Sequence, residues 1–170
     1  MKLILTLATC VLVLVALSAI LFVAYGRDRT WQRIAGDPDL GPFRLQSIER
    51  SPHPNDALLC TGDLCAQQAK VDKVLPTFKM SSDRLILAIE GKLENSGMAF
   101  TRVDDEKDAA QSRYVVRTRA LRFPDTIQFQ AIDLEKGKSG LIAYGKSQIG
   151  TADHGTNLRR LLLLTKDLDV

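Results

Sequence analysis

The chain has 170 residues, the length of one ordinary domain, and 45% of them are hydrophobic and 25% charged, as is usual in globular proteins. Its formal net charge is +3, and Lys2 supplies one of these charges ahead of a long apolar run. The remaining basic excess is too small for a typical nucleic-acid-binding protein, and it implies no strongly acidic or basic partner.

The first segment is an uncharged run of 23 residues from Leu3 to Tyr25. At about 1.5 Å per helical residue, it spans the roughly 30 Å hydrocarbon layer of a membrane. A cleaved signal peptide has a shorter apolar region of about 7–15 residues, and cleavage after Ser18 would leave an apolar new terminus. A lipoprotein signal ending at Cys10 fits poorly, because more apolar residues follow it. We therefore predict a transmembrane anchor over residues 1–25.

Two signals disagree about the side of the membrane on which the domain lies. Arg27, Arg29 and Arg33 follow the span, and the positive-inside rule would place them in the cytoplasm. Cys60 and Cys65 are the only cysteines outside the span, and such an even pair suits an oxidising compartment. We predict a single-pass protein of the cell inner membrane with its domain on the periplasmic side.

Residues 26–56 hold four of the six prolines. Because proline fixes φ and biases the preceding residue away from helix, this segment is predicted to be an irregular spacer between the membrane and the domain. The domain itself is expected over residues 57–170.

Cys60 and Cys65 admit three interpretations: a structural disulfide, two free thiols or a metal site. A disulfide would close a short ring at the start of the domain. Zinc needs about four ligands, and only His53 and His154 are available beside the two cysteines. We therefore predict no metal site and no cofactor, and leave the disulfide and the free thiols as alternatives.

The regular elements begin with a helix capped by Ser81 or Ser82, whose apolar side chains recur every four positions until Gly97 ends it. Alternating residues predict strands over residues 98–103, 113–121, 125–134 and 141–149, joined by short turns that favour antiparallel pairing. A final helix is expected over about residues 156–166. The predicted fold class is α+β: an antiparallel sheet of about four strands packed against two helices, preceded by one N-terminal transmembrane helix.

Residues Gly140 to Ser147 match the phosphate-binding pattern G-x-x-x-x-G-K-[ST] letter by letter. That site needs a loop whose amides cradle phosphate and a helix that begins at the lysine. Here the inner residues form strand-favouring Leu-Ile-Ala-Tyr, and a turn follows Lys146. We interpret the match as part of a strand.

The segment from Ser147 to Arg160 is the densest in polar and backbone-permissive residues, and it joins a strand to the last helix. One interpretation is a binding site, because backbone amides at a helix N-terminus receive anions or carboxylates. The other is structural: Asp153 and Asn157 would hold backbone amides, and Arg160 would pair with Asp153. The residues selected on either interpretation are Ser147, Gly150, Asp153, Gly155, Asn157 and Arg160, the two glycines supplying positive φ.

A catalytic interpretation of the same turn uses Ser147, Asp153 and His154 as a small hydrolase. Against it, Asp153 would cap the turn and His154 would be a solvated loop residue. We predict no catalytic residues and keep the hydrolase as the alternative.

With these residues in place, the chain resembles the bacterial and plastid family called domain of unknown function 1499. The resemblance rests on the spacing of Ser, Gly, Asp, Gly, Asn and Arg from residue 147 to residue 160, with weaker matches at Pro54-Asn55 and Phe123-Pro124-Asp125. It covers about residues 54–168. The chain departs from the family where relatives read Arg-Ser-x-Ser-Arg, because neither arginine is present in residues 144–148.

The resemblance implies an uncharacterised, often membrane-anchored domain and supplies no activity. Together with the anchor, the sequence predicts a membrane-anchored cell-envelope protein that acts as a non-catalytic binding or scaffolding module. The expected partners are the membrane, through the N-terminal helix, and an envelope protein or an anionic ligand. No nucleic acid is expected.

Overall fold

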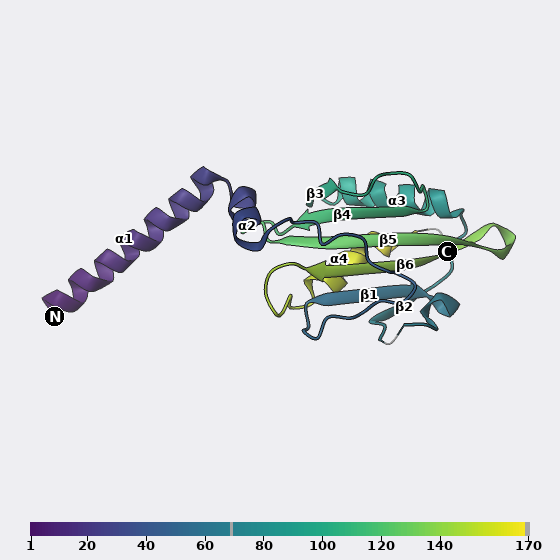
Figure 1. Ribbon diagram of the computed structural model, residues 1–170, viewed down its shortest axis with the longest axis horizontal. Helices are drawn as coiled ribbons and strands as arrows, with labels where there is room; N and C mark the ends of the chain where they lie inside the picture. Colours follow the sequence, from purple (N-terminus) through teal and green to yellow (C-terminus); the bar gives the residue numbers. More distant parts are fainter. Residues whose placement is uncertain (69, 169–170) are drawn as a thin grey trace. The chain divides into compact units, whose positions relative to one another are not determined.

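The computed structural model describes residues 1–68 and 70–168 and divides the chain into two units, Met1–Gly36 and Asp37–Val170 (Figure 1). The first unit contains α1 (Lys2–Tyr25) and α2 (Arg27–Ala35). Gly26 separates them, with a positive φ of 100° that ends the first helix. By length and composition α1 is a candidate membrane span, as predicted, and none of its residues is buried.

The second unit contains one six-stranded mixed sheet in the order β2-β1-β6-β5-β4-β3 (Figure 1). All neighbouring pairs are antiparallel except the parallel pair of β1 and β2. The strands are β1 (Asp56–Thr61), β2 (Lys73–Leu75), β3 (Ala99–Arg102), β4 (Gln111–Arg117), β5 (Pro124–Leu134) and β6 (Lys138–Ser147).

The α+β class and the four expected strands are confirmed, and the prediction of an entirely antiparallel sheet of about four strands is wrong. The two missed strands lie at one end of the sheet. β1 is buried on both faces from Ala57 to Thr61, so its sequence lacks the alternation by which strands are recognised. β2 has only three residues, which is too short for a periodic pattern.

Two helices cover one face of the sheet, as predicted (Figure 1). They are α3 (Ser82–Asn95) and α4 (Thr156–Thr165). Leu85, Ile89 and Leu93 of α3 are fully buried, because their four-residue spacing places them on one side of that helix. They form a single core with alternate residues of the strands, including Ile127 and Phe129 of β5. Leu161 and Leu164 of α4 belong to the same core, which packs α4 against the sheet after β6 ends.

The opposite face is crossed by residues 37–55, which we call the strap. Its backbone bonds to side chains of β5: the amide of Phe43 donates to Gln128 at 2.7 Å and that of Leu40 to Thr126 at 3.1 Å. Leu45 and Ile48 are buried in a second core with Tyr144. Within the predicted spacer over residues 26–56, residues 27–35 are helical, and residues 37–55 belong to the compact unit, which begins at Asp37.

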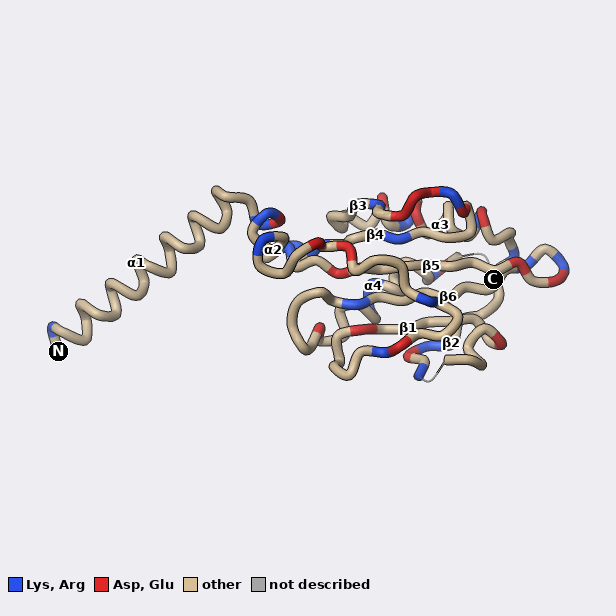
Figure 2. The backbone as a smooth tube through the Cα atoms, viewed as in Figure 1, with Lys and Arg blue, Asp and Glu red and all other residues tan. Residues whose placement is uncertain are grey.

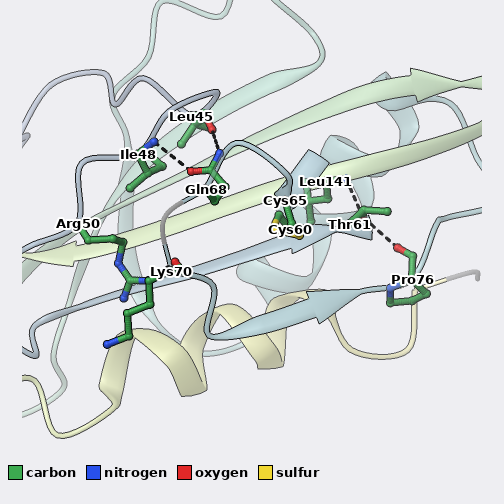
Figure 3. The surroundings of a disulfide bond; sticks show 10 residues. All are labelled: Leu45, Ile48, Arg50, Cys60, Thr61, Cys65, Gln68, Lys70, Pro76 and Leu141. Atoms are coloured by element: carbon green, nitrogen blue, oxygen red, sulfur yellow. Dashed lines mark hydrogen bonds between the residues drawn. A yellow bond between two sulfur atoms is a disulfide. The ribbon is translucent and has the colours of Figure 1, made fainter. Parts of the chain in front are cut away.

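The middle of the strap is fixed near a disulfide (Figure 3). Cys60 on β1 is bonded to Cys65 at the end of the 3-10 helix η1 (Gly62–Cys65). A short distance along the chain, Gln68 accepts a bond from the amide of Ile48 and donates one to the carbonyl of Leu45. The disulfide thus closes a short ring just before Gln68, the residue that bonds to the strap.

Candidate functional site

A buried polar network lies where β5, β6 and α4 meet. Arg160 and Asp125 form an ion pair at 2.9 Å, and their side chains are only 6% and 4% exposed. Arg160 also donates to the side-chain oxygen of Asn157 at 2.8 Å, and Asn157 donates to the hydroxyl of Ser147 at 3.0 Å. We call these four residues the brace. They connect the first turns of α4 to the ends of the two central strands.

The brace depends on a close approach between α4 and β6 at Gly145. A Cβ added to Gly145 would lie 3.1 Å from the side-chain oxygen of Asn157 and 3.2 Å from a methyl carbon of Ile127. Asn157 is itself fully buried. A residue with a side chain at position 145 would push on the atoms that bind Arg160.

Asp153 caps the turn before α4, as the structural interpretation predicts. Its two carboxylate oxygens accept the amides of Gly155 and Asn157 at 2.8 and 2.9 Å. Gly150 and Gly155 have φ values of 89° and 73°, the left-handed region that glycine enters without steric strain.

Two details of that interpretation are wrong. Arg160 pairs with Asp125 rather than Asp153, and Asn157 bonds through its side chain to other side chains and to the carbonyl of Asn55, not to amides of the turn. The amides of Gly155 and Asn157 already bind Asp153. The helix N-terminus therefore loses the feature that suggested an anion site there.

A pocket of about 400 Å³ opens beside this turn. Ser147 and Asp125 of the brace line it together with Asp153, His154 and apolar neighbours that include Phe123. No lysine or arginine is among the lining residues. Burial raises the pKa of Asp125, against the opposing effect of Arg160. Two carboxyl groups without a lining cation make this pocket unsuitable for an anion.

The hydrolase residues meet at the same pocket, but their bonds do not form a catalytic relay. Ser147 is 7% exposed, and its hydroxyl accepts a hydrogen bond from the side chain of Asn157. Both oxygens of Asp153 are engaged by backbone amides, so they do not orient His154. His154 is exposed with a φ of 51°. Among the described residues, no hydrogen bond joins His154 to Ser147.

A larger pocket of about 650 Å³ lies beneath the strap, and we call it the strap pocket. Tyr144 and Lys146 of β6 contribute to it from the sheet, and Arg44, Glu49 and Arg50 contribute from the strap. The rings of Phe43 and Tyr144 meet edge to face with centroids 4.8 Å apart. The sequence interpretation missed this pocket because its residues are spread over two distant segments.

One cation of the strap pocket is already neutralised. Arg50 forms ion pairs at 2.9 Å with Asp56 and with Asp72. Asp56 also accepts a bond from the Tyr144 hydroxyl at 2.8 Å and one from the Ser51 amide at 2.8 Å. Burial raises the pKa of Asp56, but these bonds, led by that of Arg50, outweigh it and leave the pKa below its ordinary value of 3.8.

The other two cations are not neutralised. Within residues 1–68 and 70–168, neither Arg44 nor Lys146 forms an ion pair or a side-chain hydrogen bond. Among the described residues that line the strap pocket, Glu49 is the one acid. The strap pocket therefore has two lining cations that are free of ion pairs in the described residues, whereas no described lysine or arginine lines the pocket beside the turn.

Two further sequence interpretations can be placed. The stretch from Gly140 to Ser147 lies entirely on β6, so it is a strand and not a phosphate-binding loop. A Cβ on Gly140 would approach a methyl carbon of Leu64 to 2.7 Å, which explains the glycine by packing. The described residues contain no group of three histidine, cysteine or acidic side chains arranged to hold a metal ion.

Comparison with known proteins adds no relative. The chain matches no family model, no curated protein and no solved structure. The resemblance to domain of unknown function 1499 stays a prediction. The segments on which it rests do meet in space: Asn55 donates to the carbonyl of Gly150 at 2.9 Å, and Asp125 pairs with Arg160.

Proposed function

We propose that the chain is a membrane-anchored, non-catalytic binding module of the cell envelope that holds an anionic ligand in the strap pocket. The observation that carries this proposal is the pair of cations, Arg44 and Lys146, that line a hollow of about 650 Å³ and form no ion pair with any acid of the described residues. An ion or carboxylate between them would gain charge-assisted hydrogen bonds, each worth about 1.5–3 kcal/mol. The brace is then the scaffold that fixes β6, and with it Lys146.

Binding can be tested on the full chain in detergent micelles, with inorganic phosphate and citrate as probes and chloride as the reference anion. A ligand that binds only the folded chain stabilises it by about 2.7 kcal/mol at a hundred times its Kd. We expect a phosphate- or citrate-dependent rise in melting temperature that is lost in Arg44→Gln/Lys146→Gln. Arg84→Gln/Arg119→Gln, which removes two exposed arginines elsewhere, should retain it. An equal response in both variants would refute the proposed pocket.

The competing proposal is a small hydrolase, because Ser147 and His154 line the same pocket beside the turn. A fluorophosphonate probe should label Ser147 in a hydrolase and should fail to label Ser147→Ala. The bonding of Ser147 and Asp153 favours no labelling. Labelling that depends on both Ser147 and His154 would replace the binding module with the enzyme.

The proposed compartment is the periplasmic side of the inner membrane, and the bond between Cys60 and Cys65 supports it. Structural disulfides persist in oxidising compartments, whereas cytosolic thiols are kept reduced. An alkaline phosphatase fusion at the C-terminus should be active, since that enzyme needs export. Activity of a cytoplasmic reporter alone would place the domain on the other side.

A further inference from the structure

We propose that α2 is an interfacial helix that lies in the headgroup layer of the membrane and binds anionic lipid through Arg29 and Arg33. This rests on the proposed insertion of α1 and adds a second membrane contact with its own chemistry. The occupant is the lipid surface itself, because α2 follows the candidate span after one residue, Gly26.

The first observation is the division of α2 into two faces. At about 100° per residue, Trp31, Ile34 and Ala35 share one side, and Arg29 and Arg33 lie about 150° around the axis from it. Ile34 is 70% exposed. Both arginines are exposed. Arg27, in the first turn, lies about 40° from Trp31, so only two of the three arginines are on the polar side. A short helix with an aromatic and an aliphatic residue on one side and two arginines on the other is suited to a membrane surface.

The second observation fixes the depth of this helix relative to α1. The rings of Trp31 and Phe22 meet at a T-shaped contact with centroids 5.7 Å apart. Phe22 is in the last turn of α1, which ends at Tyr25. Trp31 is therefore level with the end of the apolar run, where the hydrocarbon layer meets the headgroups. Tryptophan is enriched at that boundary.

The charges of α2 select the kind of lipid. The helix contains three arginines and one aspartate. Figure 2 shows them as blue and red segments directly after the tan trace of α1. A zwitterionic surface offers no net attraction to this charge. An anionic surface attracts each nearby basic residue by on the order of fivefold in affinity, which is about 1 kcal/mol.

The test uses Trp31, which is the one tryptophan of the sequence and hence a reporter within α2 itself. The full chain is reconstituted into vesicles of phosphatidylcholine, alone or mixed with phosphatidylglycerol. We expect Trp31 emission to be quenched more by lipids brominated near the headgroup than by lipids brominated near the bilayer centre, and weakly by iodide in the water. Energy transfer from Trp31 to a dansyl-labelled phosphatidylglycerol should exceed transfer to the labelled phosphatidylcholine.

The variants separate charge from depth. Arg29→Gln/Arg33→Gln should lower the preference for phosphatidylglycerol by on the order of fivefold per arginine, while the quenching depth of Trp31 stays the same. The matched control Arg84→Gln/Arg119→Gln removes two exposed arginines from the compact unit and should keep the preference.

Three results would overturn the inference. In the first, iodide quenches Trp31 as it quenches an exposed residue. In the second, neither iodide nor the brominated lipids quench Trp31, because it packs on the compact unit. In the third, Arg29→Gln/Arg33→Gln keeps the full preference for phosphatidylglycerol. Extraction of the chain by alkaline carbonate would show that α1 is not inserted, and would reject the anchor together with the interfacial helix. An inserted chain with Trp31 in water rejects only the interfacial helix.

Discussion

The ion pair between Arg160 and Asp125 gives the sharpest stability prediction. The charged atoms are 2.9 Å apart, and the two side chains are 6% and 4% exposed. At an effective dielectric constant of about 20, Coulomb's law gives an attraction of about 6 kcal/mol at that distance, which the desolvation of both groups largely offsets. Removing one partner leaves the other charge buried without compensation. Arg160→Met should therefore lower the free energy of unfolding by about 3–5 kcal/mol.

A double-mutant cycle measures the coupling. Asp125→Val should be as destabilising as Arg160→Met, because it leaves a buried guanidinium. The double variant should be about as destabilising as either single one, so the two effects fall short of adding by the cost of one of them, about 3–5 kcal/mol. In Arg160→Met the loss should also shrink at low pH, because the unpaired Asp125 is protonated there and no longer carries its charge.

The assay is urea unfolding of the full chain in micelles, followed by circular dichroism and fitted with a common slope. Arg159→Met is the matched control, since Arg159 is the neighbouring residue on α4 and is exposed. It should change the free energy of unfolding by less than about 1 kcal/mol. The reasoning that the buried ion pair stabilises the brace would be refuted by either of two results. One is that the effects of Arg160→Met and Asp125→Val on the free energy of unfolding add. The other is that Arg159→Met and Arg160→Met lower it equally.

Three further outcomes follow from other contacts. Asp56→Asn should lower the free energy of unfolding by about 2 kcal/mol near neutral pH. Because the pKa of Asp56 is lowered in the folded chain, that difference should hold above pH 3.8 and vanish as the pH falls through the folded pKa, as urea titrations at several pH values would show. Cys60→Ser/Cys65→Ser should lower the free energy of unfolding by about 2 kcal/mol. Urea unfolding of the unchanged chain should show the same difference between its oxidised and reduced forms. Gly145→Ala should be destabilising by about 1–3 kcal/mol in thermal melts, since the new methyl group meets Asn157; a neutral result would show that α4 can move aside.

Elements whose partners are near in sequence could be predicted from the sequence. The four-residue spacing of Leu85, Ile89 and Leu93 is enough to identify α3, and its buried side is the predicted one. The alternation of β5 likewise places Ile127 and Phe129 toward the helices. These patterns indicate which residues of an element face the helix-covered core.

Elements defined by distant contacts could not be predicted in this way. The acid that pairs with Arg160 lies 35 residues away, whereas Asp153 is close in sequence and already occupied by amides. Nothing local marks Gln128 as an acceptor for the amide of Phe43. Prolines correctly indicate an extended backbone for the strap, but they do not show whether that backbone is free or bound to a sheet.

The strap also constrains the order in which the chain folds. Its acceptors on β5 lie 85 residues beyond Phe43 and 86 beyond Leu40, so they emerge from the ribosome long after the strap does. Contacts of such sequence separation form slowly, because a long loop must close first. Until β6 exists, Leu45 and Ile48 lack Ile142 and Tyr144, which complete the core that they enter. The segment that directly follows α2 in the sequence is therefore the first part of the compact unit to be made, and it can dock only after the strands beneath it have paired.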